Sequence, residues 1–66
     1  MTKILLEIPD EVADNLRIPP DECANRVRIE LAIRLYQKQI LSLGKARELT
    51  QLSKWDFHEL LAQENI

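Results

Sequence analysis

The chain has 66 residues, 45% of them hydrophobic and 30% charged, a composition typical of one small ordered domain rather than of a disordered tail. Nine Lys and Arg side chains against eleven Asp and Glu give a formal net charge of -2, which excludes a general electrostatic attraction to nucleic acid or to an anionic membrane. One cysteine and one histidine exclude an internal disulfide and a structural zinc site.

The length also bears on location and assembly. No apolar run approaches the roughly 20 residues that cross a bilayer, and the N-terminus is too short and acidic for a secretory signal, so we expect a cytoplasmic protein without a membrane partner. A domain this small buries a small fraction of its surface when it folds alone, and disulfides, a metal or a partner subunit usually reinforce it. Because the first two are excluded, we expect association into a homodimer.

The N-terminal residues 3–8 predict a short β-strand that ends at Pro9. The apolar side chains of Ile4, Leu6 and Ile8 lie on one side of such an extended segment. The side chains at positions 3, 5 and 7, two of which are charged, lie on the other side. A lone strand leaves its backbone groups unpaired and is not stable by itself. Because the sequence offers no second strand, we expect antiparallel pairing with the same strand of a second subunit.

Two helices are expected next, over about residues 10–17 and 20–41, separated by a Pro-Pro pair. The apolar side chains of the longer helix fall into two stripes on nearly opposite sides. The first stripe is Ala24, Val27, Leu31 and Leu35, and the second is Ile29, Ile33, Tyr36 and Ile40. Since so short a chain cannot cover both sides, we interpret the second stripe, in particular Ile29, Ile33 and Tyr36, as a partner-binding surface.

A strand followed by two helices is the order of a ribbon-helix-helix protein, a dimer whose paired strands enter the major groove of DNA. In that arrangement Lys3, Leu5 and Glu7 face the DNA. Glu7 meets phosphates or base edges badly, and Asp21 and Glu22 occupy the helix N-terminus that often docks on a phosphate. The pattern therefore supports the dimer better than it supports the DNA contact.

The C-terminal residues 42–66 have the spacing of a helix-turn-helix. Ser42 is a suitable N-cap for a short helix, residues 52–53 form a turn, and a last helix buries Phe57 with the apolar residues three and four positions after it. This last helix carries three acidic side chains against Lys54 alone, whereas a helix in a DNA groove must approach phosphates. Trp55 is either an interface anchor or a core residue, burial being marginally favoured.

Catalysis and metal binding find no support in the sequence. His58 and Glu59 point about 100° apart on one helix, and no Ser or Cys lies near His58 in the sequence to be activated. Gly44 is the single glycine, so the chain has no glycine-rich phosphate loop. We therefore expect no enzyme, no catalytic residue, no metal site and no cofactor.

Several segments together resemble a known family. They are LEIPDE at residues 6–11, Pro20, ELA at residues 30–32, Tyr36, LSLGKA at residues 41–46 and LSKWDF at residues 52–57. This order resembles a family of short bacterial and archaeal proteins long catalogued as uncharacterised, whose members are commonly treated as antitoxins and are often encoded beside PIN-domain nuclease toxins. The resemblance covers nearly the whole chain. It departs at Arg47, Thr50 and Gln51, which replace the alanines and the glycine expected around the turn.

The sequence therefore predicts a mainly α fold with a short N-terminal strand plus four helices. The expected arrangement is a ribbon-helix-helix-like dimer with a C-terminal helix-turn-helix-like pair. We expect one domain over residues 1–66, in which residues 1–41 dimerise and residues 42–66 form the helix-turn-helix-like part.

For function, the residues and the resemblance together predict a small antitoxin-type or adaptor protein that binds and masks a protein partner. The resemblance implies that this partner is a PIN-domain nuclease toxin. The partner-binding side chains are expected on the last helix, at Trp55, Asp56 and Glu59, or on the second stripe. The alternative is a DNA-binding transcription regulator, weak on its own, that touches phosphates with Lys3, Lys45, Arg47 and Lys54. A third class is a subunit that stabilises a larger assembly.

Overall fold

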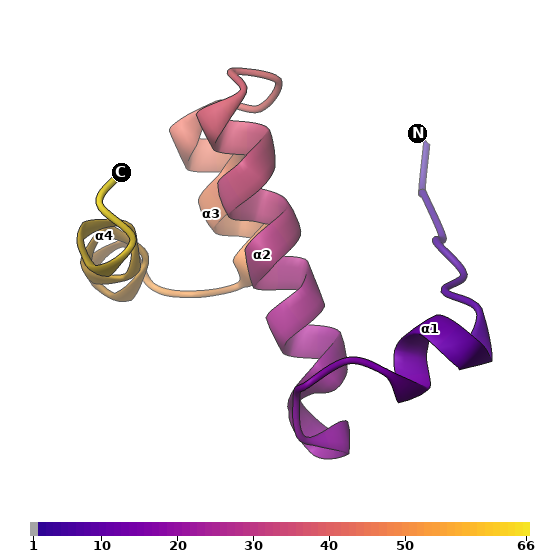
Figure 1. Ribbon diagram of the computed structural model, residues 1–66. Helices are drawn as coiled ribbons and strands as arrows, with labels where there is room; N and C mark the ends of the chain where they lie inside the picture. Colours follow the sequence, from indigo (N-terminus) through magenta and orange to yellow (C-terminus); the bar gives the residue numbers. More distant parts are fainter. Residues whose placement is uncertain (1) are drawn as a thin grey trace.

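The computed structural model describes residues 2–66, and its regular structure is helical (Figure 1). In chain order the elements are α1 (Asp10–Asp14), a short 3-10 helix η1 (Pro20–Glu22), α2 (Cys23–Gln37), α3 (Leu43–Thr50) and α4 (Lys54–Gln63). The prediction of a mainly helical chain is confirmed, although α1 and α2 are shorter than the sequence suggested. The chain leaves α2 where Gln39 takes a left-handed conformation with φ 60°, because such a residue cannot continue a right-handed helix.

The predicted N-terminal strand is wrong. Residues 2–9 have no regular structure, and no residue in the described range 2–66 belongs to a β-strand. The ribbon-helix-helix fold, which needs that strand, is therefore wrong as well. Alternation of side chains only favours an extended backbone, whereas a strand also needs a neighbour for its N–H and C=O groups, and this chain supplies none.

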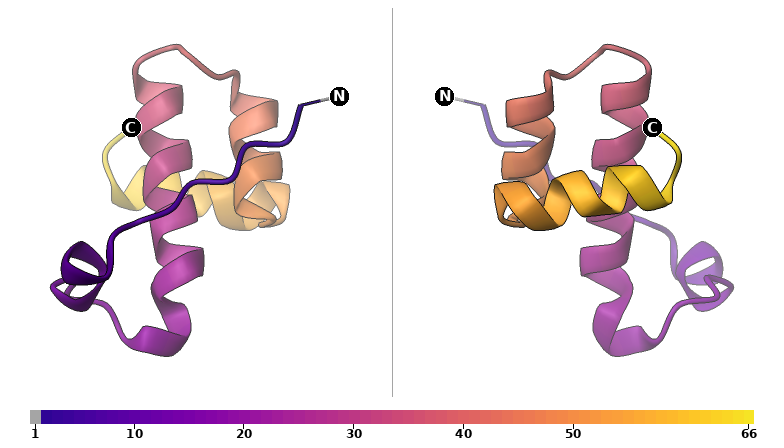
Figure 2. Two further views of the ribbon diagram at one scale, coloured as in Figure 1. Left: turned by 90° about the vertical axis from the view of Figure 1, so that its right-hand side faces the viewer. Right: turned by 90° about the vertical axis from the view of Figure 1, so that its left-hand side faces the viewer.

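The hydrophobic core lies where α2, α3 and α4 meet. α2 and α3 run antiparallel side by side, and α4 crosses both (Figure 2). Five apolar residues are buried there: Ala32, Ile33, Ala46, Phe57 and Leu61. Phe57 is completely buried, and the small side chains of Ala32 and Ala46 allow α2 and α3 to pack closely. Burial of the Phe57 ring alone stabilises the fold by roughly 1.5–3 kcal/mol.

Serine side chains set where the last two helices begin. The Ser42 Oγ accepts a hydrogen bond from the backbone N–H of Lys45 at 3.3 Å, which confirms the predicted cap of α3. The Ser53 Oγ accepts in the same way from the backbone N–H of Asp56 at 3.1 Å, at the start of α4. Each cap contributes about 1 kcal/mol by satisfying an amide that has no partner within the helix.

Residues 2–28 take no part in this core. None of residues 2–31 is buried. The N-terminal segment and α1 lie on the side of α2 that faces away from α4 (Figure 1). Among the described residues, no helix combines the length and the apolar character that a membrane span requires.

Candidate partner-binding surface on α4

The outward side of α4 presents a tryptophan to solvent. Trp55 is 79% exposed, so the burial that the sequence marginally favoured is wrong. The reason is helical geometry: Trp55 precedes the buried Phe57 by two positions, and two positions separate side chains by about 200° around a helix. Because Phe57 and Leu61 both point into the core, Trp55 must point away from it.

Two carboxylates accompany this ring. Asp56 and Glu59 are exposed on the same helix, and we call Trp55, Asp56 and Glu59 the Trp55 face. Asp56 lies in the first turn of α4, where the positive end of the helix dipole favours a negative side chain. The Trp55 face thus combines a large apolar ring with negative charge.

The orientation of the Trp55 face depends on the turn between α3 and α4. Gln51 takes the left-handed conformation there, with φ 64° and ψ 13°. The Thr50 hydroxyl donates to the carbonyl of Arg47 at 2.7 Å and accepts from the N–H of Leu52 at 3.2 Å. The Arg47 guanidinium donates to the carbonyl of Leu52 at 3.2 Å. Arg47, Thr50 and Gln51 therefore hold the turn closed without a glycine.

The four cations expected on DNA phosphates do not form one basic face. Lys45 pairs with Glu48 at 2.9 Å, and this hydrogen bond, followed by the attraction between the charges, lowers the pKa of the Glu48 carboxyl. Arg47 is engaged in the turn. Lys54 is exposed at the start of α4. The N-terminal segment that carries Lys3 lies on the opposite side of α2 from α4 (Figure 1).

A small hollow lies between α3 and α4. It measures about 230 Å³, below the range of roughly 300–1,000 Å³ that is usual for small-molecule pockets. Its lining consists of Leu43, Gly44, Arg47, Lys54, Phe57 and His58. With an apolar floor and an Arg47 side chain already bonded to the turn, the hollow is better explained by helix packing than by a bound metabolite.

The second stripe of α2 lies largely inside the chain. Ile33 is buried in the core, and Ile29 and Tyr36 pack against it half-buried. Ile33 is therefore unavailable to a partner unless the core opens. The first stripe is the more open one, since Ala24 and Leu31 are exposed. Sequence reasoning missed this surface because either stripe matches a core equally well, and only the position of α3 and α4 decides between them.

Within residues 2–66, no three His, Cys, Asp or Glu side chains gather closely enough to hold a metal ion. His58 and Glu59 are both exposed on α4.

Comparison with known proteins places the chain in a family. Residues 1–66 match the family described as Uncharacterised protein family (UPF0175). A protein of Aeropyrum pernix named UPF0175 protein is 56% identical over 64 residues, which are 97% of this chain and 67% of that relative. No solved structure is significantly similar to the chain. The chain therefore belongs to the UPF0175 family.

Proposed function

We propose that this chain is a small antitoxin-type or adaptor protein that binds a protein partner through the Trp55 face and masks it. The observation that carries the proposal is the exposed ring of Trp55, at 79%, beside the carboxylates of Asp56 and Glu59. Tryptophan is enriched among the residues that dominate binding energy at protein interfaces. An exposed Trp is costly to leave in water, so a partner that covers it gains hydrophobic energy.

The charge of the Trp55 face favours a basic partner. Opposite charges around an apolar anchor speed association and select the partner. A nuclease that holds an RNA or DNA backbone needs cations near its active site. An acidic face that covers such a site both binds it and blocks it. The PIN-domain nucleases implied by the family resemblance are partners of this chemistry.

The experiment is a binding measurement with the product of the neighbouring gene. The two proteins are co-expressed and purified, and the dissociation constant is measured by calorimetry for the native chain and for Trp55→Ala. We expect a loss of about 2 kcal/mol, or about 30-fold in affinity, with the circular dichroism of the free chain unchanged.

Ile40→Ala is the matched control, because Ile40 is apolar and 66% exposed but lies in the loop after α2. We expect this variant to bind at full strength. If Trp55→Ala unfolds the free chain, or binds as tightly as the native chain, the Trp55 face is not the interface.

A DNA-binding regulator is the second candidate, and the observation that favours it is the helix-turn-helix arrangement of α3 and α4. With few free cations on this part of the chain, we expect weak binding that falls steeply with salt. Fluorescence anisotropy with duplex DNA at about 0.15 M salt tests it. Tight binding to one duplex that is lost in Lys54→Ala would favour the regulator over the masking protein.

We also propose that the chain forms a homodimer, and its exposed surface area supports this part of the proposal. The chain exposes 5890 Å², whereas a compact globule of 7.7 kDa exposes about 4,300 Å². The excess is about 1,600 Å² per chain. Two chains that bury this excess form an interface of about 3,200 Å² in total, which lies within the range of obligate homodimers.

A further inference from the structure

The excess surface is concentrated in the first half of the chain. Five of the eight large apolar side chains that are exposed lie there: Ile4, Leu5, Leu6, Val12 and Leu31. Ile4 and Leu5 are 85% and 88% exposed. Since none of residues 2–31 is buried, this half has no core of its own, and exposed apolar patches of this kind mark interaction surfaces.

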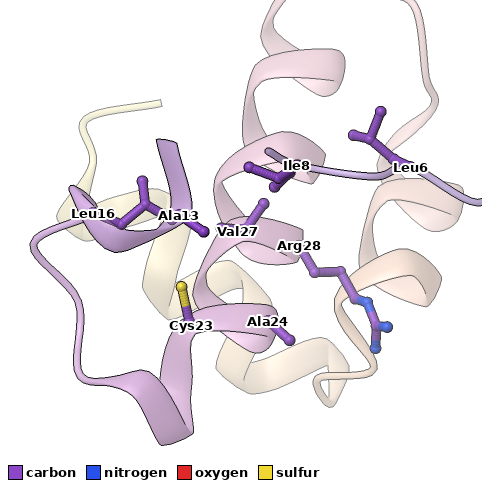
Figure 3. A pocket seen from close by; sticks show the side chains of 8 residues that line it. All are labelled: Leu6, Ile8, Ala13, Leu16, Cys23, Ala24, Val27 and Arg28. Carbon is purple, nitrogen blue, oxygen red and sulfur yellow. The ribbon is translucent and has the colours of Figure 1, made fainter. Parts of the chain in front are cut away.

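An apolar groove runs through this half (Figure 3). It has a volume of about 260 Å³ and lies between the N-terminal segment, α1 and the first turns of α2. The N-terminal segment contributes Leu6 and Ile8, α1 contributes Ala13, the next residues contribute Leu16, and α2 contributes Cys23, Ala24, Val27 and Arg28. In Figure 3, Ile8, Ala13 and Val27 converge from three segments. The groove is open to solvent, so whatever fills it must be mainly apolar.

One lining residue is charged, and its charge restricts the occupant. Arg28 is half-buried, and within residues 2–66 it makes no ion pair, the two pairs being Arg26–Glu30 and Lys45–Glu48. A group that covers Arg28 and excludes water is expected to supply hydrogen-bond acceptors, and a carboxylate is the strongest of these. Residues 2–22 of this same chain carry six acidic and two basic side chains. This half of a second copy therefore offers both apolar side chains that suit the groove and carboxylates that suit Arg28.

We infer that the occupant is a second copy of this chain, with the N-terminal half of each subunit covering the groove of the other about a two-fold axis. This inference rests on the homodimer proposed above and names its surface. Packing of apolar side chains, not pairing of strands, holds the two chains together. α4 stays free, because it lies on the opposite side of α2 (Figures 1 and 2), so one dimer presents two Trp55 faces.

The test is sedimentation equilibrium of the full chain at micromolar concentration, with Leu6→Asp as the variant. Leu6 lines the groove and is 73% exposed in the single chain, so its loss removes little from the fold. In the proposed dimer a carboxylate of the other copy already pairs with Arg28, so the added carboxylate has no cation left to pair with, and its burial is expected to weaken the dimer at least about 100-fold. Ile40→Asp is the matched control, since Ile40 is 66% exposed and does not line the groove. We expect it to remain dimeric, and both variants to keep the circular dichroism of the native chain.

The Cys23 thiol gives a second measurement that does not depend on a variant's stability. Cys23 is half-exposed and lines the groove, so a thiol reagent should modify it slowly in the native dimer and in Ile40→Asp, and much faster in Leu6→Asp. A native chain that is monomeric would overturn both the dimer and its surface. A native dimer that Leu6→Asp leaves intact, with Cys23 equally reactive in all three proteins, would overturn the surface alone. Neither result bears on the Trp55 face, which the calorimetric experiment tests separately.

Discussion

Replacing Gln51 with glycine should stabilise the protein. Gln51 has φ 64° and ψ 13°, a conformation in which Cβ crowds the backbone and which costs an ordinary residue about 1–2 kcal/mol. Glycine removes this cost, while its greater freedom in the unfolded chain opposes the gain by about 0.4–1 kcal/mol. The Gln51 side chain is exposed and makes no hydrogen bond within the described residues, so nothing else is lost. The net gain is about 0.5–1 kcal/mol.

The assay is thermal and urea unfolding followed by circular dichroism, at one fixed protein concentration because a dimer's stability depends on it. A domain of this size gains about 4–8 °C in Tm per kcal/mol, so we expect an increase of about 2–8 °C. The chain offers matched controls with the same exchange. Gln39 also has a positive φ, of 60°, and Gln39→Gly should stabilise as well. Gln37 closes α2 with helical geometry, and Gln37→Gly should destabilise by about 0.5–1 kcal/mol.

The signs of the three changes in the free energy of unfolding test whether the left-handed conformation limits the stability of the turn. If Gln51→Gly lowers the free energy of unfolding, or shifts it by the same amount as Gln37→Gly, the left-handed conformation is not what limits this turn. The argument from φ would then be refuted, and the hydrogen bonds of Arg47 and Thr50 would have to account for the turn by themselves.

Two further predictions concern the core and the charges. Phe57→Ala should destabilise the chain by about 3–5 kcal/mol, because Phe57 is completely buried. We expect this variant to lose its cooperative unfolding transition, whereas Trp55→Ala, at an exposed position of the same helix, should keep it. The Glu48 carboxyl should titrate below its ordinary pKa of 4.5, because Lys45 donates a hydrogen bond to it, and NMR should show the pKa of Glu48 rise in Lys45→Ala. Since the folded-state pKa is the lower one, the pair's contribution to stability is present above the unfolded pKa and is lost as the pH falls through the folded one.

The last two helices could be predicted from the sequence, because the signals that define them are local. Ser42 satisfies amides within its own helix, and the spacing of Phe57, Leu60 and Leu61 defines one side of α4 whatever lies beneath it. The N-terminal segment is different. Its alternation describes which side each residue takes, but a strand exists only when a second strand supplies its hydrogen bonds. Nothing in residues 3–8 contains that information.

The two stripes of α2 show the same limit for the candidate surfaces. Both are apolar, so the sequence predicts that both need cover. Which of them the chain covers depends on the side from which α3 and α4 return, and this choice buries Ile33 and leaves Leu31 exposed. The exposure of Trp55, in contrast, was predictable, because a side chain two positions before the buried Phe57 lies on the opposite side of any helix.

Helix-turn-helix geometry and DNA binding depend on different residues, and in this chain the geometry is present without the basic outward surface that DNA binding needs. The geometry depends on the turn at Gln51 and on the core beneath α4, and both are present. Binding to DNA depends instead on the outward side chains, where a tryptophan and two carboxylates accompany Lys54. A scaffold that orients one helix firmly while surrounding its apolar anchor with negative charge suits a basic protein surface better than a phosphate backbone. If the charges on the outward side of α4 determine what it binds, then changing Asp56 and Glu59 to Lys should weaken binding to the protein partner and strengthen binding to DNA, without changing the fold.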